Sequence, residues 1–148
     1  SGPLIYKFEG IKRNGQKNSV NERENFFSFI TGLEFVKTRI FQKIWDLNLF
    51  VEYCNDDRGS NSTDIFQNDF FLGSRITFNN VAGTEISQAL TFDLDGNGNT
   101  ANIEISSRLN DTLRVTADYN FYWSSKSTDT LYSFRRDNYL GIKLTNYF

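Results

Sequence analysis

The strongest chemical motif in the chain is a run of oxygen-bearing side chains between Asp93 and Glu104. Asp93, Asp95, Asn97 and Glu104 have the spacing of a calcium-binding loop, in which alternating oxygen ligands surround a glycine turn. The flanking segments alternate like strands, however, and Asp-Gly-Asn-Gly is by itself a strong hairpin signal. We therefore interpret this run as a hairpin, keep its four oxygen-bearing residues only as a weak metal candidate, and expect neither a metal nor a cofactor.

The chain has few groups suited to catalysis. It contains no His, which excludes Ser-His-Asp triads, His-ligated zinc and imidazole bases. Glu104 and Asp118 could in principle act as an acid–base pair, but charged residues within strands are far more often structural. We predict that the protein is not an enzyme and has no catalytic residues.

The composition of the chain excludes several classes of protein. The chain has 148 residues, one domain's worth, and Ser1–Pro3 resemble a scar left by a tag-removing protease. A net charge of −2 leaves no basic footprint for nucleic acid. Mean hydropathy is −0.49, and no stretch approaches the ~18 consecutive apolar residues of a membrane-spanning helix. The 16% content of aromatic residues argues against disorder.

Apolar and polar residues alternate along most of the chain, which is the period of a strand. About eight such segments occur, at residues 4–11, 25–36, 44–53, 69–79, 86–94, 101–109, 112–123 and 140–148. They are near the ~9–11 residues that a tilted membrane strand needs. Longer connections (14–24, 55–67, 95–100 and 124–137) alternate with short ones (37–43, 79–83 and 109–112). This arrangement is typical of up-and-down barrels with one elaborated end.

The two faces of these strands differ in chemistry. One face carries charges of both signs, expected to line a lumen: Lys7, Glu9, Glu34, Asp46, Glu52, Arg75, Asp93, Glu104, Arg108, Arg114, Asp118 and Lys143. On a lipid face each would cost ~2–4 kcal/mol at mid-depth. The apolar face carries aromatic residues near the strand ends, as in an interfacial girdle: Trp45, Tyr53, Phe70, Phe78 and Trp123. We predict an all-β fold, a single transmembrane antiparallel up-and-down β-barrel over residues 1–148.

The last eleven residues, Asn138 to Phe148, resemble the C-terminal assembly signal of bacterial outer-membrane β-barrels. Phe148, Leu144, Ile142 and Leu140 match its alternating apolar pattern, whereas Asn146 departs from it. Residues 52–59, 68–79 and 131–148 also look like the C-terminal region of longer proteobacterial outer-membrane proteins. The resemblance implies a Gram-negative outer membrane, periplasmic termini, contact with outer-membrane lipid and lipopolysaccharide, and folding by the barrel-assembly machinery.

Three functions remain open at this point. The first is a structural or surface-interaction barrel, whose lumen is filled by ion-paired side chains and whose long loops meet lipopolysaccharide or a partner. The second is a porin-like transport channel, alone or as the C-terminal half of a larger barrel. The third is a soluble ligand-binding barrel, in which the apolar face would point inward.

Overall fold

The computed structural model describes residues 3–96, 98–127 and 129–148. Eight antiparallel strands form one sheet in the order β1-β2-β3-β4-β5-β6-β7-β8, each paired with its neighbours in sequence. The strands are β1 (Leu4–Lys17), β2 (Arg23–Ile40), β3 (Trp45–Asp56), β4 (Asn68–Thr77), β5 (Glu85–Asp93), β6 (Asn99–Arg108), β7 (Leu113–Trp123) and β8 (Tyr139–Asn146). The predicted all-β, up-and-down arrangement is confirmed. Across the described residues, however, the pairing runs only from β1 to β8 and does not close the sheet.

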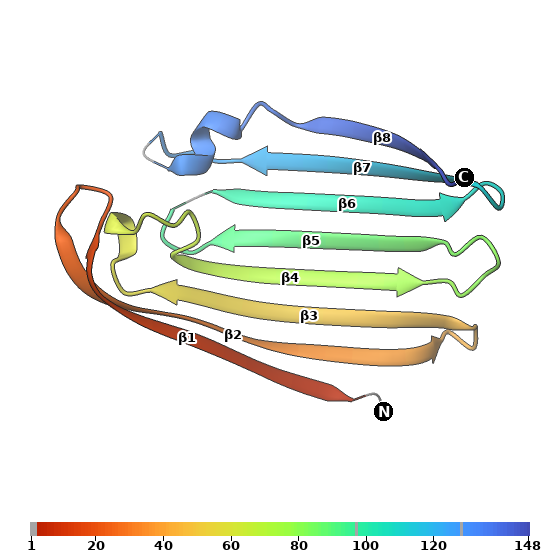
Figure 1. Ribbon diagram of the computed structural model, residues 1–148, viewed down its shortest axis with the longest axis horizontal. Helices are drawn as coiled ribbons and strands as arrows, with labels where there is room; N and C mark the ends of the chain where they lie inside the picture. The colour runs from red at the N-terminus through yellow and green to blue at the C-terminus, as the bar shows by residue number, and fades with distance from the viewer. Residues whose placement is uncertain (1–2, 97, 128) are drawn as a thin grey trace.

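The two longest connections between strands lie at the same end of the sheet, which we call the loop end (Figure 1). At the loop end, segment 57–67 contains the short helix η1 (Gly59–Asn61) and segment 124–138 contains η2 (Thr130–Phe134). The connections 41–44, 78–84 and 109–112 form the turn end, where both termini also lie. The elements of the described part include no helix long and apolar enough to cross a membrane.

The first hairpin is longer than the alternation pattern indicates. β1 and β2 pair as far as Lys17 and Arg23, so most of the expected connection 14–24 is strand. A bulge after Arg13 interrupts the alternation, and Gly15 there has a positive φ of 65°. Asn18 then closes the turn by accepting hydrogen bonds from the backbone N–H groups of Val20 and Glu22. The hairpin therefore projects beyond its neighbours at the loop end.

The register gives the sheet two chemically distinct faces. We call the face that carries Leu4, Phe35, Leu49, Ile103 and Leu140 the apolar face, and the opposite one the polar face. Consecutive residues of a strand point to opposite faces, so these positions assign the other paired residues of each strand.

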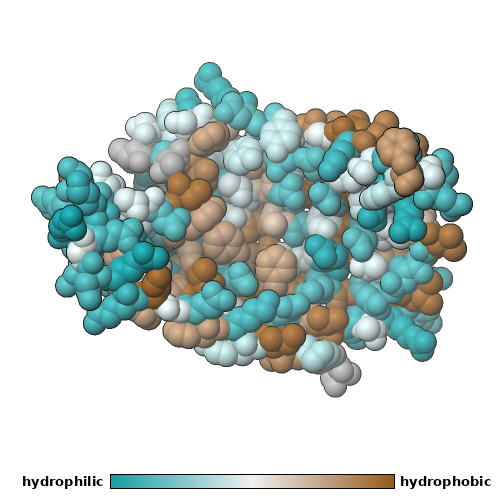
Figure 2. Space-filling model, viewed as in Figure 1, coloured by the Kyte–Doolittle hydropathy of each residue, from teal (hydrophilic) through white to brown (hydrophobic). Residues whose placement is uncertain are grey.

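Burial is the reverse of that in an ordinary soluble sheet. In the described part the only buried hydrophobic residues are Phe26, Ile40 and Cys54. The polar face is the more buried one, with Asp69 2% and Thr91 7% exposed. On the apolar face, Ile103 is 47% exposed and Ile142 71%. In Figure 2 hydrophilic side chains gather on the projecting end of the first hairpin, and hydrophobic and hydrophilic side chains are mixed along the strands. Among the described residues, therefore, no second layer covers the apolar side of the sheet.

Candidate functional site

The register places all twelve charged residues expected in a lumen on the polar face: Lys7, Glu9, Glu34, Asp46, Glu52, Arg75, Asp93, Glu104, Arg108, Arg114, Asp118 and Lys143. Within the described residues, one ion pair joins members of this set, Lys7 Nζ to Glu34 Oε2 at 2.7 Å. Arg75, Glu104 and Lys143 are exposed. This pair lies at the β1–β2 edge of the sheet, and its lysine side chain is 51% exposed.

Polar side chains on this face also bond along the sheet. Asn48 Nδ2 donates to Glu34 Oε1 over 2.9 Å. Asn102 Nδ2 donates to Asn120 Oδ1 over 2.9 Å, and Asn120 Nδ2 donates to Asp118 Oδ2 over 2.7 Å. The first two contacts link neighbouring strands, and the third joins two positions of β7.

Two side chains on the polar face lie over glycines. The Phe50 ring lies over Gly73, and the Asp118 carboxylate lies over Gly141, where in each case a Cβ atom would collide. Beside Phe50, a hollow of ≈ 290 Å³ is lined by Asn48, Arg75 and Asn102, among others. The centre of the polar face is thus hollow in this structure.

The five aromatic residues predicted to form a girdle lie at the two ends of the apolar face. Trp45 and Phe78 pack at the turn end, with ring centroids 4.7 Å apart. At the loop end, Tyr53 packs on Phe70 at 6.2 Å and Trp123 on Phe121 at 5.1 Å. Trp45 and Tyr53 are eight residues apart on β3, or about 27 Å along the strand. We call the region between the two groups the apolar band.

The residues of the C-terminal pattern lie on an uncovered strand. Leu140, Ile142 and Leu144 project from the apolar face of β8 and are 66%, 71% and 64% exposed. Phe148 follows β8 and is fully exposed.

The hairpin of residues 93–104 does not bring Asp93 and Glu104, two residues of the weak metal candidate, close together. Asp93 Oδ1 accepts hydrogen bonds from the backbone N–H groups of Asp95 at 2.9 Å and Gly96 at 2.7 Å, as in an Asx turn. Glu104 lies opposite Ser87, about 20 Å along β5 from Asp93. Asn97 lies outside the described residues, which contain no group of three or more potential metal-ligating acids or thiols.

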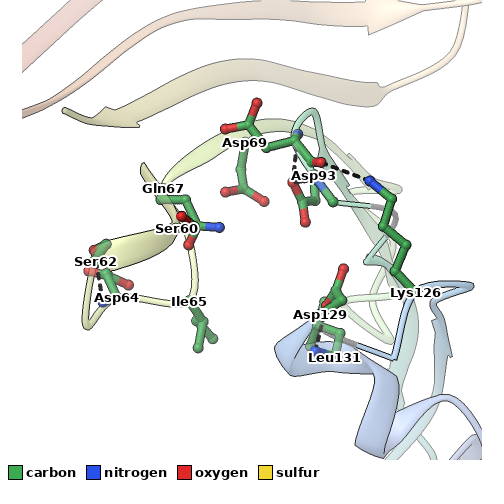
Figure 3. A pocket seen from close by; sticks show the side chains of 12 residues that line it. Ser60, Ser62, Asp64, Ile65, Gln67, Asp69, Asp93, Lys126, Asp129 and Leu131 are labelled. Carbon is green, nitrogen blue, oxygen red and sulfur yellow. Dashed lines mark hydrogen bonds between the residues drawn. The ribbon is translucent and has the colours of Figure 1, made fainter. Parts of the chain in front are cut away.

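A pocket of ≈ 440 Å³ at the loop end was not predicted from the sequence (Figure 3). Three separate segments form it, and it is lined by the carboxylates Asp64, Asp69, Asp93, Asp95 and Asp129. Lys126 reaches across its rim and donates to the backbone oxygen of Asp95 over 3.2 Å. These acids come together only when three loops that are distant in the sequence fold against one another. No local spacing of residues could therefore have predicted the pocket.

Asp69 is the most buried acid of this pocket. It lies one residue beyond Phe70 on the loop side, outside the apolar band. Burial, together with the charges of Asp93 and Asp129, raises the pKa of its carboxyl group to about 6. Opposite it on β3, burial raises the pKa of the Cys54 thiol to about 11, so this thiol is not a nucleophile near neutral pH.

A buried ion pair fixes the loop between β3 and β4. Arg58 Nη2 lies 2.6 Å from Asp56 Oδ2, and these side chains are only 4% and 3% exposed. The guanidinium also lies 3.6 Å from the centroid of the Phe26 ring. Arg58 holds the pKa of the Asp56 carboxyl below its usual value by donating hydrogen bonds to it. The loop is therefore anchored to β2 and the projecting hairpin.

No protein-family model, curated protein or solved structure matches this chain. Arguments about its function consequently depend on the physical chemistry of the sheet and its loops.

Proposed function

We propose that the chain forms the wall of a β-barrel channel in a Gram-negative outer membrane, with the apolar face in lipid and the polar face toward water. The observation that carries this proposal is the reversed burial of the sheet. Ile103, Ile142 and Leu72 are exposed, whereas Asp69 and Thr91 are buried. In water such a face would be a large aggregation-prone patch, whereas lipid would cover it without a second protein layer.

The dimensions of the apolar face support the same proposal. Aromatic side chains bound it at both ends, and the apolar band is about 27 Å along β3. Strand tilt shortens this to about 20 Å along the membrane normal, near the ~25 Å lipid-facing band of outer-membrane barrels. The turn end, with both termini, would then face the periplasm and the loop end the exterior.

The polar face favours a channel over a filled interior. Its centre has a hollow of ≈ 290 Å³, and Arg75 and Glu104 are exposed there. The absence of a side chain at Gly73 leaves room for the Phe50 ring close to the backbone of this face. Water-filled lumens have polar, charged walls of this kind.

A matched pair of substitutions tests the membrane assignment. Ile103→Arg places a charge on the apolar face, and Val81→Arg places it in the exposed turn 78–84. In lipid vesicles, Ile103→Arg should destabilise the folded state by ~2–4 kcal/mol, and Val81→Arg by at most ~1 kcal/mol. Equal tolerance of both changes, together with a folded monodisperse parent protein without detergent, would exclude the membrane proposal and favour the soluble barrel.

The loop end supports a second candidate, a surface-interaction barrel. The ion pair of Arg58 with Asp56 holds one loop, and the ≈ 440 Å³ acidic pocket lies beside it. Such a rigid exterior surface could meet lipopolysaccharide or a partner molecule. Conductance in planar bilayers distinguishes the two candidates, since a barrel with only a surface role would give no steady channels.

A further inference from the structure

The two outer edges of the sheet suggest how the channel is completed. We propose that β8 of one copy pairs with β1 of a second copy, so that two eight-stranded sheets close one barrel, with Lys143 of one copy opposite Glu9 of the other. This inference rests on the proposed function, because only an edge within lipid has to be paired.

Each edge strand has one side without a partner in the described part of the chain. β1 pairs with β2 alone and β8 with β7 alone. Water can satisfy such edges, but hydrocarbon cannot, so open sheet edges do not occur within the lipid core. In a membrane both edges must therefore find another strand.

The width of the lumen favours a second copy over closure of one sheet on itself. Eight strands enclose an interior just wide enough for side chains to fill, whereas about sixteen leave an aqueous channel. The polar face has exposed charges at Arg75 and Glu104 and a hollow beside Phe50, rather than side chains packed against an opposite wall. Two sheets of eight strands match the wider class.

We call the junction of β8 of one copy with β1 of the other the seam. The register within the sheet restricts which residues can face each other there. The pairs that start at Leu4 lead through Phe35 on β2, Leu49 on β3 and Ile103 on β6 to Leu140 on β8. With a rise of ~3.4 Å and a strand spacing of ~4.8 Å, a tilt of about 35–45° shifts this row by roughly eight to eleven residues per eight strands. Only an even shift keeps like faces together, which leaves eight or ten. Leu140 therefore lies opposite Lys12 or Asn14 of the next sheet rather than Leu4.

The charges of the residues that would face each other favour the smaller of the two shifts. The smaller shift places Lys143 opposite Glu9 on the polar face and Leu144 opposite Phe8 on the apolar face. The larger shift places Lys143 opposite Ile11, and one further step would place it opposite Arg13. Facing opposite charges stabilise a strand pair and facing like charges destabilise it. The same tilt and charges apply at both seams of a two-fold pair.

Disulfide trapping tests the seam. In a Cys54→Ser background, copies with Glu9→Cys are mixed with copies with Lys143→Cys, refolded together into lipid vesicles and oxidised. Facing Cβ atoms lie within reach of a disulfide, so the band on a non-reducing gel should shift from the 17.2 kDa chain to the covalent dimer. Neither variant alone can form this particular link, and each serves as a control.

A mismatched pair checks the register. Ile11→Cys mixed with Lys143→Cys should stay mostly monomeric, and efficient trapping of this pair instead would overturn the proposed register. One chain that carries both Glu9→Cys and Lys143→Cys separates the two modes of closure. An oxidised monomer with an internal link, or no link at all, would overturn pairing with a second copy. Such a result leaves the channel proposal standing if Ile103→Arg still destabilises the protein in lipid, so the two failures are distinguishable.

Discussion

Asp69 on β4 lies directly opposite Asp93 on β5, and both carboxylates line the acidic pocket at the loop end. Two acids at facing positions repel each other when both are ionised. Asp69 is 2% exposed, and its raised pKa of about 6 means that it holds a proton more readily than an acid in water. The pocket is thus a place where pH acts on the stability of the loops.

Replacement of Asp69 by Asn should stabilise the protein in a pH-dependent way. The folded-state pKa of about 6 lies above the ordinary value of 3.8. The contribution of this carboxyl to stability is therefore complete below pH ~4 and is lost as the pH rises through 6, up to about 3 kcal/mol in total. Thermal unfolding in detergent should show a higher Tm for Asp69→Asn at pH 8 and little change at pH 4. Asp95→Asn, at an exposed pocket position, is the control. A pH-independent effect of Asp69→Asn would contradict this explanation.

The Arg58–Asp56 pair should be required for an ordered loop between β3 and β4. Arg58→Ala leaves the Asp56 carboxylate buried without its partner, since both side chains are less than 5% exposed. Breaking a buried pair in this way costs about 3–5 kcal/mol. Urea unfolding should report that loss, and proteolysis within 57–67 should become faster. Arg58→Ala combined with Asp56→Ala should recover part of the stability, because no uncompensated charge remains. If the double variant were less stable than the single one, the charge explanation would fail.

The sheet itself could be predicted from the sequence because alternation is a local property. Each strand shows its own period of two, and the faces then follow without knowledge of the neighbours. Thus the positions of Glu104 and Asp118 on one face and of Ile103 and Tyr119 on the other followed from the alternation. The projecting hairpin was missed because the bulge at Gly15 interrupts that period.

The acidic pocket and the edges depend on non-local contacts. Asp64, Asp69 and Asp129 are up to 65 positions apart and meet only after three loops pack together. Alternation also carries no information on whether β1 meets β8, because the number of strands around a barrel depends on curvature and on the strands available. The sequence consequently predicted strands and faces better than it predicted closure.

Substitution of Gly73 should destabilise the protein while Phe50 is present. The Phe50 ring covers this glycine on the polar face, and a Cβ atom would collide with it. Gly73→Ala should therefore cost about 1–3 kcal/mol through displacement of the ring. Gly73→Ala combined with Phe50→Ala should lose less than the two single changes together, because the ring is no longer there to be displaced. Strictly additive losses in denaturant unfolding would show that the ring contact is not the cause.

Charges on the polar face should set the ion selectivity of the channel. Glu104 is exposed at the middle of β6, and Glu104→Lys reverses its charge there. Rings and clusters of charged side chains favour ions of the opposite sign, so this variant should shift the reversal potential in a salt gradient toward anion preference. Asp111→Lys makes the same change in charge in the turn 109–112, outside the strands, and should leave the reversal potential close to that of the parent protein. Planar-bilayer recordings of both variants measure the difference. An equal shift in both, or none in Glu104→Lys, would mean that ions do not pass along this face.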